Sequence, residues 1–154
     1  MNGQALSPSP IPAVIAVVVH EGHALLVRRA NPPDAGLWGF PGGKIDYGET
    51  VADAALRELF EETSITAWAR DVITTLDIFE RAGDESLKRH FILIAVRCEW
   101  ICGVPEAGDD ALEARWFPIA ELHPGRTDMS ADVDVVARHA EELALRDKAG
   151  LKSR

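Results

Sequence analysis

The chain has 154 residues, of which 47% are hydrophobic and 27% charged, and its formal net charge at pH 7 is −9. This length predicts a single domain with its own core, and the longest apolar runs are too short to span a membrane, so we expect no membrane contact. The acidic balance argues against binding of polymeric nucleic acid, which needs a basic surface, but a nucleotide stays open as a ligand if a bound metal supplies positive charge.

The termini and the cysteines indicate where the domain lies and in which compartment it works. Residues 1–11 predict a flexible N-terminal arm, without the basic and long apolar regions of a secretory signal. We expect residues 12–148 to form the domain and residues 149–154 a C-terminal tail. Cys98 and Cys102 have no further cysteine or nearby histidine to complete a zinc site, so we expect two reduced thiols in a cytoplasmic protein.

The first third of the chain predicts a β-hairpin, a loop and a short strand. Residues 13–19 form a valine-rich apolar run that suits a buried strand, and residues 24–29 read as its hairpin partner. The two prolines within residues 30–36 predict a loop. Residues 37–40 predict a short strand that leads into a turn at residues 41–43, where glycine lets the backbone approach the next element closely.

The following segment predicts an amphipathic helix. Thr50 followed by Asp53 is typical of a capped helix start, and no helix-breaking residue follows until about Thr63. At roughly 100° per residue, three glutamates fall within one arc and four apolar residues fall on the opposite side, which we expect to dock on the core. The glutamates are Glu58, Glu61 and Glu62, and the apolar residues are Ala52, Leu56, Leu59 and Phe60.

The second half of the chain predicts further strands and a final helix. Residues 88–100 alternate strongly, with Phe91, Leu93 and Ala95 on one face and Ile92, Ile94 and Val96 on the other. The remaining expectations are one or two strands in 65–80, a polar loop at 81–86, an acidic loop at 103–110, a strand at 114–117, one helical turn at 118–122 and a helix over 130–148.

Residues 43–65 carry the most specific pattern in the chain. Gly43 is followed after five residues by Glu49, and after seven more by the run Arg57-Glu58-Leu59-Phe60-Glu61-Glu62. This pattern resembles the Nudix box, G-x5-E-x7-R-E-U-x-E-E-x-G-U with U bulky and aliphatic. It matches eight of the nine specified positions, the exception being Ser64 where the family has glycine. The resemblance covers roughly residues 13–146 and implies an α/β fold, the α/β/α sandwich with a mixed β-sheet.

The clustered glutamates indicate a metal site, although a solvated acidic face is the usual interpretation of such a cluster. Hard oxygen ligands at this density suit Mg²⁺, with Mn²⁺ as the alternative, because the cation also offsets the repulsion between them. By resemblance, Glu58 and Glu62 are the firmest ligands, Glu61 is a ligand or the catalytic base, and Gly42 offers its carbonyl oxygen.

Two further positions complete the predicted catalytic set. Arg57 can reach Glu61 one turn later or fold back to Glu49, and it would orient a carboxylate rather than react. In the acidic loop, family members often place an additional ligand or base, and we favour Asp110 for this role. Its neighbours Asp109 and Glu113 are the alternatives, as is a solvated loop without a role in the reaction.

The predicted substrate-binding residues are Arg28, Arg29, Trp38 and Phe79. Adjacent residues of a strand face opposite sides, so one of the two arginines should point into the cleft and the other should be a surface charge. The rings of Trp38 and Phe79 are candidates for stacking on a base, and core packing is the alternative for Trp38. Farther along, Arg81, Lys88, Arg89 and His90 are candidates for holding a phosphate, or else belong to a solvated loop.

The resemblance implies a hydrolase that cleaves a nucleoside diphosphate linked to another moiety. Residues 25–50 look most like the ADP-ribose pyrophosphatase group, so ADP-ribose is the favoured substrate among small-molecule nucleotide derivatives. However, Arg81 stands where that group often carries proline. A sanitising hydrolase of oxidised nucleoside triphosphates is the first alternative. A non-catalytic nucleotide sensor is the second, although such proteins typically lack the box carboxylates. The resemblance also leaves open a homodimer.

Overall fold

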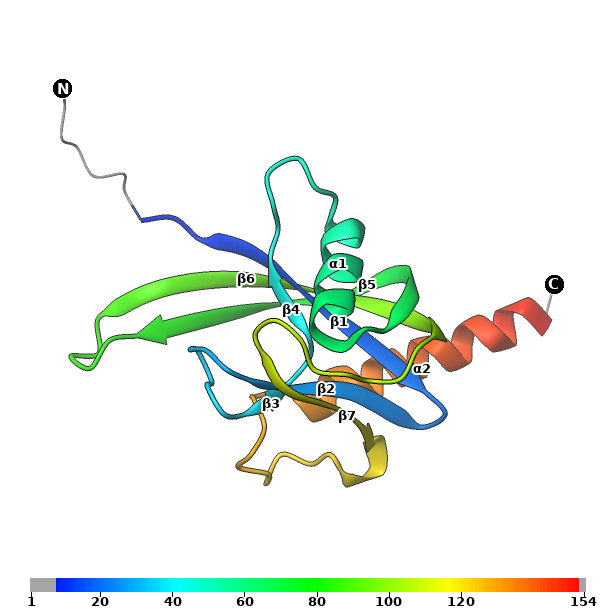
Figure 1. Ribbon diagram of the computed structural model, residues 1–154. Coiled ribbons are helices and arrows are strands. Elements are labelled where there is room, and N and C mark those ends of the chain that lie inside the picture. The colour runs from blue at the N-terminus through cyan, green and yellow to red at the C-terminus, as the bar shows by residue number, and fades with distance from the viewer. Residues whose placement is uncertain (1–7, 153–154) are drawn as a thin grey trace.

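The computed structural model describes the backbone of residues 8–152 and the side chains of residues 8–150. Within this range a seven-stranded sheet has the path β3-β2-β1-β6-β5, with β4 paired to β1 and β7 paired to β2 (Figure 1). The elements are β1 (Ile11–His20), β2 (His23–Arg29), β3 (Trp38–Gly39), β4 (Gly42–Lys44), α1 (Val51–Thr63), β5 (Thr66–Arg81), β6 (Leu87–Cys102), β7 (Ala111–Pro118), the 3-10 turn η1 (Ile119–Glu121) and α2 (Val133–Lys152).

Strand β1 organises the sheet because it pairs on both sides. It runs parallel to β6, with Ile11 opposite Phe91 at one end of the pairing, and antiparallel to β2 in the predicted hairpin, with Val19 opposite Ala24. The glycine-rich β4 also pairs with β1, so the sheet is mixed. The acidic motif therefore follows a strand that is fixed to the centre of the fold.

Two hydrophobic clusters lie on opposite faces of the sheet, one against each long helix (Figure 1). On β1, Ile15 and Val17 pack in the cluster that contains α2, whereas Val14, Ala16 and Val18 pack in the cluster that contains α1. This alternation is the period of two expected of a strand. The predicted α/β/α sandwich with a mixed sheet is confirmed.

Strand β6 follows the alternation that the sequence predicts. Leu93 and Ala95 pack on the α2 side, and Ile94 and Val96 pack on the α1 side. Beyond the region that faces β1, the hairpin of β5 and β6 continues as a two-stranded arm that extends away from the body of the fold (Figure 1).

Three elements show the clearest differences from the prediction. Residues 42–44 form strand β4 rather than a turn, because their backbone pairs with β1. Residues 66–81 form one continuous strand, since they pair with β6 from Thr66 to Arg81 despite several register shifts. The final helix begins at Val133 and continues to Lys152, later and longer than predicted.

The predicted arm and tail overlap these elements. Residues 1–7 of the arm lie outside the described residues, and Ile11 already belongs to β1. Residues 149–152 continue α2, and the last two residues lie outside the described range. The domain boundaries stay predictions. Among residues 8–152, neither helix combines the length and the apolar character needed to cross a membrane.

The buried side of α1 also differs from the predicted side. Ala55 and Leu59 are fully buried as expected of apolar helix residues, but Phe60 is 57% exposed, so the prediction that it docks on the core is wrong. The side facing the sheet instead carries the two carboxylates Glu58 and Glu62, which are 9% and 6% exposed. The side of the helix that carries Glu58 and Glu62 therefore faces the sheet, where the glycines of β4 leave space.

Candidate active site

Helix α1 is held at both ends by contacts that are local in sequence. Thr50 caps its start, since the hydroxyl accepts a 3.0 Å hydrogen bond from the Asp53 amide. Its end is Ser64, which adopts the left-handed conformation with φ 62° and ψ 15° and donates its amide to the Phe60 carbonyl. Serine thus takes the backbone geometry for which glycine is preferred, and the glutamates between the two ends are fixed in place.

The two glycines of β4 make room for the glutamates of α1. A Cβ atom added at Gly43 would lie 2.5 Å from Oε1 of Glu58, and one added at Gly42 would overlap the Val14 carbonyl. The amide of Gly42 donates a 3.2 Å hydrogen bond to Oε2 of Glu62. This amide is the contact that ties Gly42 to the helix, and the predicted role of its carbonyl oxygen stays a prediction.

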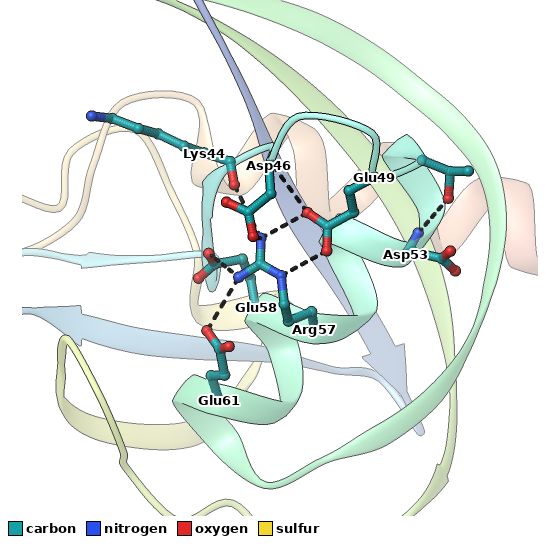
Figure 2. Close-up of polar contacts among 8 residues, drawn as sticks. Lys44, Asp46, Glu49, Asp53, Arg57, Glu58 and Glu61 are labelled. Carbon is teal, nitrogen blue, oxygen red and sulfur yellow. Dashed lines mark hydrogen bonds and ion pairs between the residues drawn. The ribbon is translucent and has the colours of Figure 1, made fainter.

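Arg57 joins the carboxylates of the motif to one another (Figure 2). Its Nε donates to Oε2 of Glu49 at 2.7 Å and its Nη2 to Oε1 of Glu49 at 2.9 Å, a bidentate pair. Its Nη1 donates to Glu58 at 2.9 Å and to Glu61 at 3.3 Å. Both partners that the sequence offered for Arg57 are therefore engaged, together with Glu58.

The same guanidinium fixes the charge state of Glu49. Hydrogen bonds from the Arg57 side chain, and next from the Asp46 backbone, lower the pKa of Glu49 to about 2. Arg57 in turn donates to the Lys44 carbonyl at 3.2 Å, which connects the helix to the end of β4. Glu49 thus serves as an ionised support for Arg57, which holds the carboxylates on the next turns of the helix.

Three carboxylates from two segments converge beside this arginine. Glu58, Glu61 and Asp109 each offer one oxygen, and these oxygens all lie within 4.8 Å of one another. Asp109 comes from the loop before β7 and has a left-handed backbone with φ 52°. The loop is fastened to the helix end, since the amide of Gly108 donates to the Glu62 carbonyl. The sequence analysis favoured Asp110 in this loop, whereas in the structure Asp109 is the residue that joins Glu58 and Glu61.

Asp110 lies close by but makes a different contact. It lines the same cleft, and its Oδ1 accepts a 3.0 Å hydrogen bond from the side-chain amide of Asn31. Its backbone carbonyl accepts from the Ala30 amide, which ties the acidic loop to the loop after β2. The third candidate, Glu113, pairs instead with Arg28 at 3.0 Å.

Burial and mutual repulsion raise the pKa values of the two inward glutamates. For Glu58, burial is the main cause; Arg57 opposes the shift, and Glu61 and Asp109 add to it. For Glu62, burial and then the charge of Glu58 raise the pKa to about 8. Negative charge is therefore unfavourable in this site, and a divalent cation is the group that would offset it. With oxygen donors only, and space left by glycine, the residues present fit Mg²⁺ or Mn²⁺.

A cleft of about 440 Å³ extends from these carboxylates across the α2 side of the sheet. A volume of this order is typical of small-molecule sites. Its lining combines apolar side chains with polar and charged ones. The lining includes Arg29, Asn31, Asp34, Phe40, Glu58, Glu62, Leu76, Ile78, Arg89, Phe91, Leu93, Asp109, Asp110, Ser130, Asp132 and Val133.

The two predicted arginines of β2 separate as strand alternation requires. Arg29 lines the cleft, with its Nε donating to the Pro33 carbonyl at 2.8 Å. Arg28 points to the other side and pairs with Glu113. Arg29 is thus the member of the pair that a ligand in the cleft can reach.

Neither aromatic ring predicted to stack on a base lines the cleft. Trp38 is 5% exposed, and its ring packs edge-on against Phe117 at 4.8 Å. Phe79 is 51% exposed and lies against the His90 ring on the hairpin arm. For Trp38 the alternative of core packing holds, because β3 is buried between β2 and the segment before α2. For Phe79, alternation along β5 turns the ring away from the cleft.

Comparisons with known proteins agree on one family. The family model described as NUDIX domain matches residues 9–138. An ADP-ribose pyrophosphatase of Methanocaldococcus jannaschii is 33% identical over 113 residues, which cover 73% of this chain and 64% of that protein. A putative 8-oxo-dGTP diphosphatase 2 of Mycobacterium tuberculosis is 36% identical over 113 residues, covering 71% and 75% of the two chains. The chain thus spans less than two thirds of the archaeal relative.

Among solved structures, a MutT NUDIX hydrolase from Burkholderia pseudomallei superimposes with a TM-score of 0.72 at 25% sequence identity. The match covers 85% of this chain and 98% of the bacterial one. The similarity therefore extends over most of the chain rather than over the motif alone.

Proposed function

The chain belongs to the Nudix hydrolase family, and on that premise we propose that it hydrolyses the diphosphate bond of a nucleoside diphosphate linked to another moiety, with Mg²⁺ as the cofactor. The observation that carries this proposal is the convergence of Glu58, Glu61 and Asp109 at one end of the cleft. An acidic cluster beside a cavity of this volume suits a phosphate substrate only together with a cation.

The residues of the site would have two roles, metal binding and alignment of the metal ligands. Glu58, Glu61, Glu62 and Asp109 would hold Mg²⁺, or Mn²⁺ in its place. Bound there, the cation neutralises the diphosphate and lowers the pKa of the attacking water. Arg57 keeps the carboxylates aligned through the contacts that it makes to three glutamates.

The reaction needs a proton acceptor and a phosphate contact. Water attacks one phosphorus, the bridging P–O bond breaks, and Asp110 or Glu61 takes the proton that the water loses. Arg29 supplies a fixed positive charge on the cleft wall, where it can contact a phosphate oxygen. Asp110 is well placed for the proton, because Asn31 orients its carboxylate from outside the acidic cluster.

ADP-ribose is the substrate we favour, with an oxidised nucleoside triphosphate as the alternative. Relatives of each kind share about a third of the residues over a similar length, so similarity alone does not choose between them. The choice of ADP-ribose rests on residues 25–50, whose sequence resembles that group. The homodimer stays a prediction, for which sedimentation of the purified chain is the test.

The products distinguish the two substrates. ADP-ribose should yield AMP and ribose 5-phosphate, and 8-oxo-dGTP should yield the monophosphate and pyrophosphate. We expect the purified chain to release AMP from ADP-ribose with Mg²⁺, and to release none with excess EDTA. Turnover of 8-oxo-dGTP alone would support the sanitising alternative. Tight binding of ADP-ribose without cleavage of any substrate would support the non-catalytic sensor and contradict the proposal.

A further inference from the structure

The cleft ends on the β5–β6 hairpin, far along the sheet from the carboxylates. Three cross-strand pairs follow one another there, Leu76 with Leu93, Ile78 with Phe91, and Glu80 with Arg89. Alternate residues of a strand share a face, so Leu93, Phe91 and Arg89 form one row. All three line the cleft, as do Leu76 and Ile78. The apolar floor of the cleft therefore extends along the hairpin as far as the Arg89 guanidinium.

This guanidinium is held rigidly in a plane. Its Nε donates to Oε1 of Glu80 and its Nη2 donates to Oε2, both at 2.8 Å, which makes a bidentate pair. Its Cζ lies 5.3 Å from the centre of the Phe91 ring, within the range of a cation–π contact. One edge is thus occupied by Glu80 and one face by Phe91. The plane is preorganised before any ligand arrives.

The pairing with Glu80 argues against a phosphate as the group that Arg89 contacts. A guanidinium paired with a bidentate carboxylate offers little net charge to an anion, and Lys88, which lies 3.9 Å from the same carboxylate, does not line the cleft. A flat, neutral ligand does not need net charge. Arginine planes stack on nucleobases, and the row of apolar side chains beside Arg89 provides a surface for the rest of a nucleoside.

We propose that Arg89, clamped by Glu80 and backed by Phe91, is the platform on which the nucleobase of the substrate stacks. The phosphates then extend toward Arg29 and the carboxylates of α1 at the other end of the cleft. This inference rests on the proposed function and replaces Trp38 and Phe79 as the stacking residues. Stacking tolerates every base, because each has a π face. The platform by itself therefore favours ligands that carry a base over ligands that lack one, and it does not distinguish one purine from another.

The two products of ADP-ribose hydrolysis give a direct test, because AMP carries the base and ribose 5-phosphate does not. Their dissociation constants can be measured by calorimetry with Mg²⁺ present and without turnover. The variants are Arg89→Gln, Arg89→Lys and Glu80→Gln, with Arg70→Gln as the matched control. Arg70 is exposed, pairs with Glu99 across the same two strands, and does not line the cleft.

We expect Arg89→Gln to weaken AMP binding about tenfold, on the scale of losing one base–side-chain stack. Ribose 5-phosphate binding should stay within about twofold in every variant. Arg89→Lys should fail to restore AMP binding, because lysine keeps the charge but has no plane. Glu80→Gln should give an intermediate loss, since the guanidinium is present but less fixed. Arg70→Gln, which removes an arginine paired with a carboxylate outside the cleft, should bind both products like the unmodified chain.

Three results would overturn the inference. The first is AMP affinity that is unchanged in Arg89→Gln. The second is equal weakening of AMP and ribose 5-phosphate with rescue by lysine, which would make Arg89 a phosphate contact. The third is an unmodified chain that does not bind AMP at millimolar concentration. Circular dichroism checks that each variant is folded, and if Arg89→Gln does not fold, Arg89→Lys and Glu80→Gln decide.

The outcome is separable from that of the proposed function. AMP binding that depends on Arg89, in a chain that hydrolyses no substrate, would contradict the hydrolase and leave the base platform standing. Hydrolysis of ADP-ribose with a KM that Arg89→Gln does not change would support the hydrolase and contradict the base platform. If both proposals hold, Arg89→Gln raises KM about tenfold and leaves kcat within about twofold, because the base lies away from the reacting phosphorus.

Discussion

The two ends of the cleft use charge in opposite ways. At the α1 end, the oxygens of Glu58, Glu61 and Asp109 lie close together, and Glu58 and Glu61 share Arg57. At the hairpin end, Arg89 is matched by one carboxylate in a bidentate pair and surrounded by apolar side chains. The first end is left with negative charge that a cation would offset, whereas the Arg89–Glu80 pair at the second end is neutral by itself. The comparison indicates that chemistry belongs to the first end and recognition to the second.

The strongest way to break this comparison is to remove charge at the α1 end. We expect Glu58→Gln and Glu62→Gln each to lower kcat by roughly two to four orders of magnitude, the scale for loss of an electrostatic or acid–base element. The fold should survive, because both side chains face the cleft and glutamine keeps their shape. Steady-state turnover at saturating Mg²⁺ measures the effect, with Glu142→Gln on the exposed side of α2 as the control. Full activity in either variant would remove the central assignment.

The loop before β7 tests which acid holds metal and which takes the proton. We expect Asp110→Ala to lower kcat by about two orders of magnitude with Mg²⁺ affinity nearly intact, as for loss of a general base. Asp109→Ala should instead raise the Mg²⁺ concentration needed for half-maximal activity about tenfold, since its oxygen lies within 4.8 Å of those of Glu58 and Glu61. Glu113→Ala should change neither. Full activity in all three variants would place the base inside the box, at Glu61.

A single methyl group at β4 sharpens the comparison, because it disturbs the α1 end without touching charge. We expect Gly43→Ala to reduce kcat about a hundredfold, since a Cβ atom would lie 2.5 Å from Glu58 and displace its carboxylate by about an ångström. The cost in stability should be small, as only the end of a flexible side chain must move. Gly83→Ala, which meets nothing within 4 Å, is the matched control. Thermal melts and turnover, measured together, separate misalignment from unfolding.

The smallest expected effect concerns the end of α1. Ser64 occupies the left-handed region at φ 62°, so Ser64→Gly should relieve strain and raise the free energy of unfolding by about 1 kcal/mol. Turnover should not change, because Glu58 lies almost two turns earlier in the helix. Thermal unfolding and Mg²⁺-dependent kinetics check both parts. A large gain in kcat without a gain in stability would mean that serine misaligns the carboxylates of the α1 end.

The sequence by itself determined the features that depend on neighbours in the chain. The bounds of α1, the capping by Thr50, the hairpin of β1 and β2, and the alternation along β6 all follow from local spacing and propensity. The acidic motif is of the same kind, because a helix places residues three and four positions apart on one side. The fold class followed from this motif through its resemblance to a family.

Only the tertiary structure decided the features that depend on partners distant in the chain. Asp109 rather than Asp110 joins the cluster because the loop docks on the end of α1. Trp38 is enclosed by strands and loops far away in sequence. Arg89 enters the cleft because the pairing of β6 with β5 places it opposite Glu80, in a row with Phe91 and Leu93. The physical reason is that local periodicity fixes which side of an element a residue occupies, whereas packing and strand register fix what that side faces.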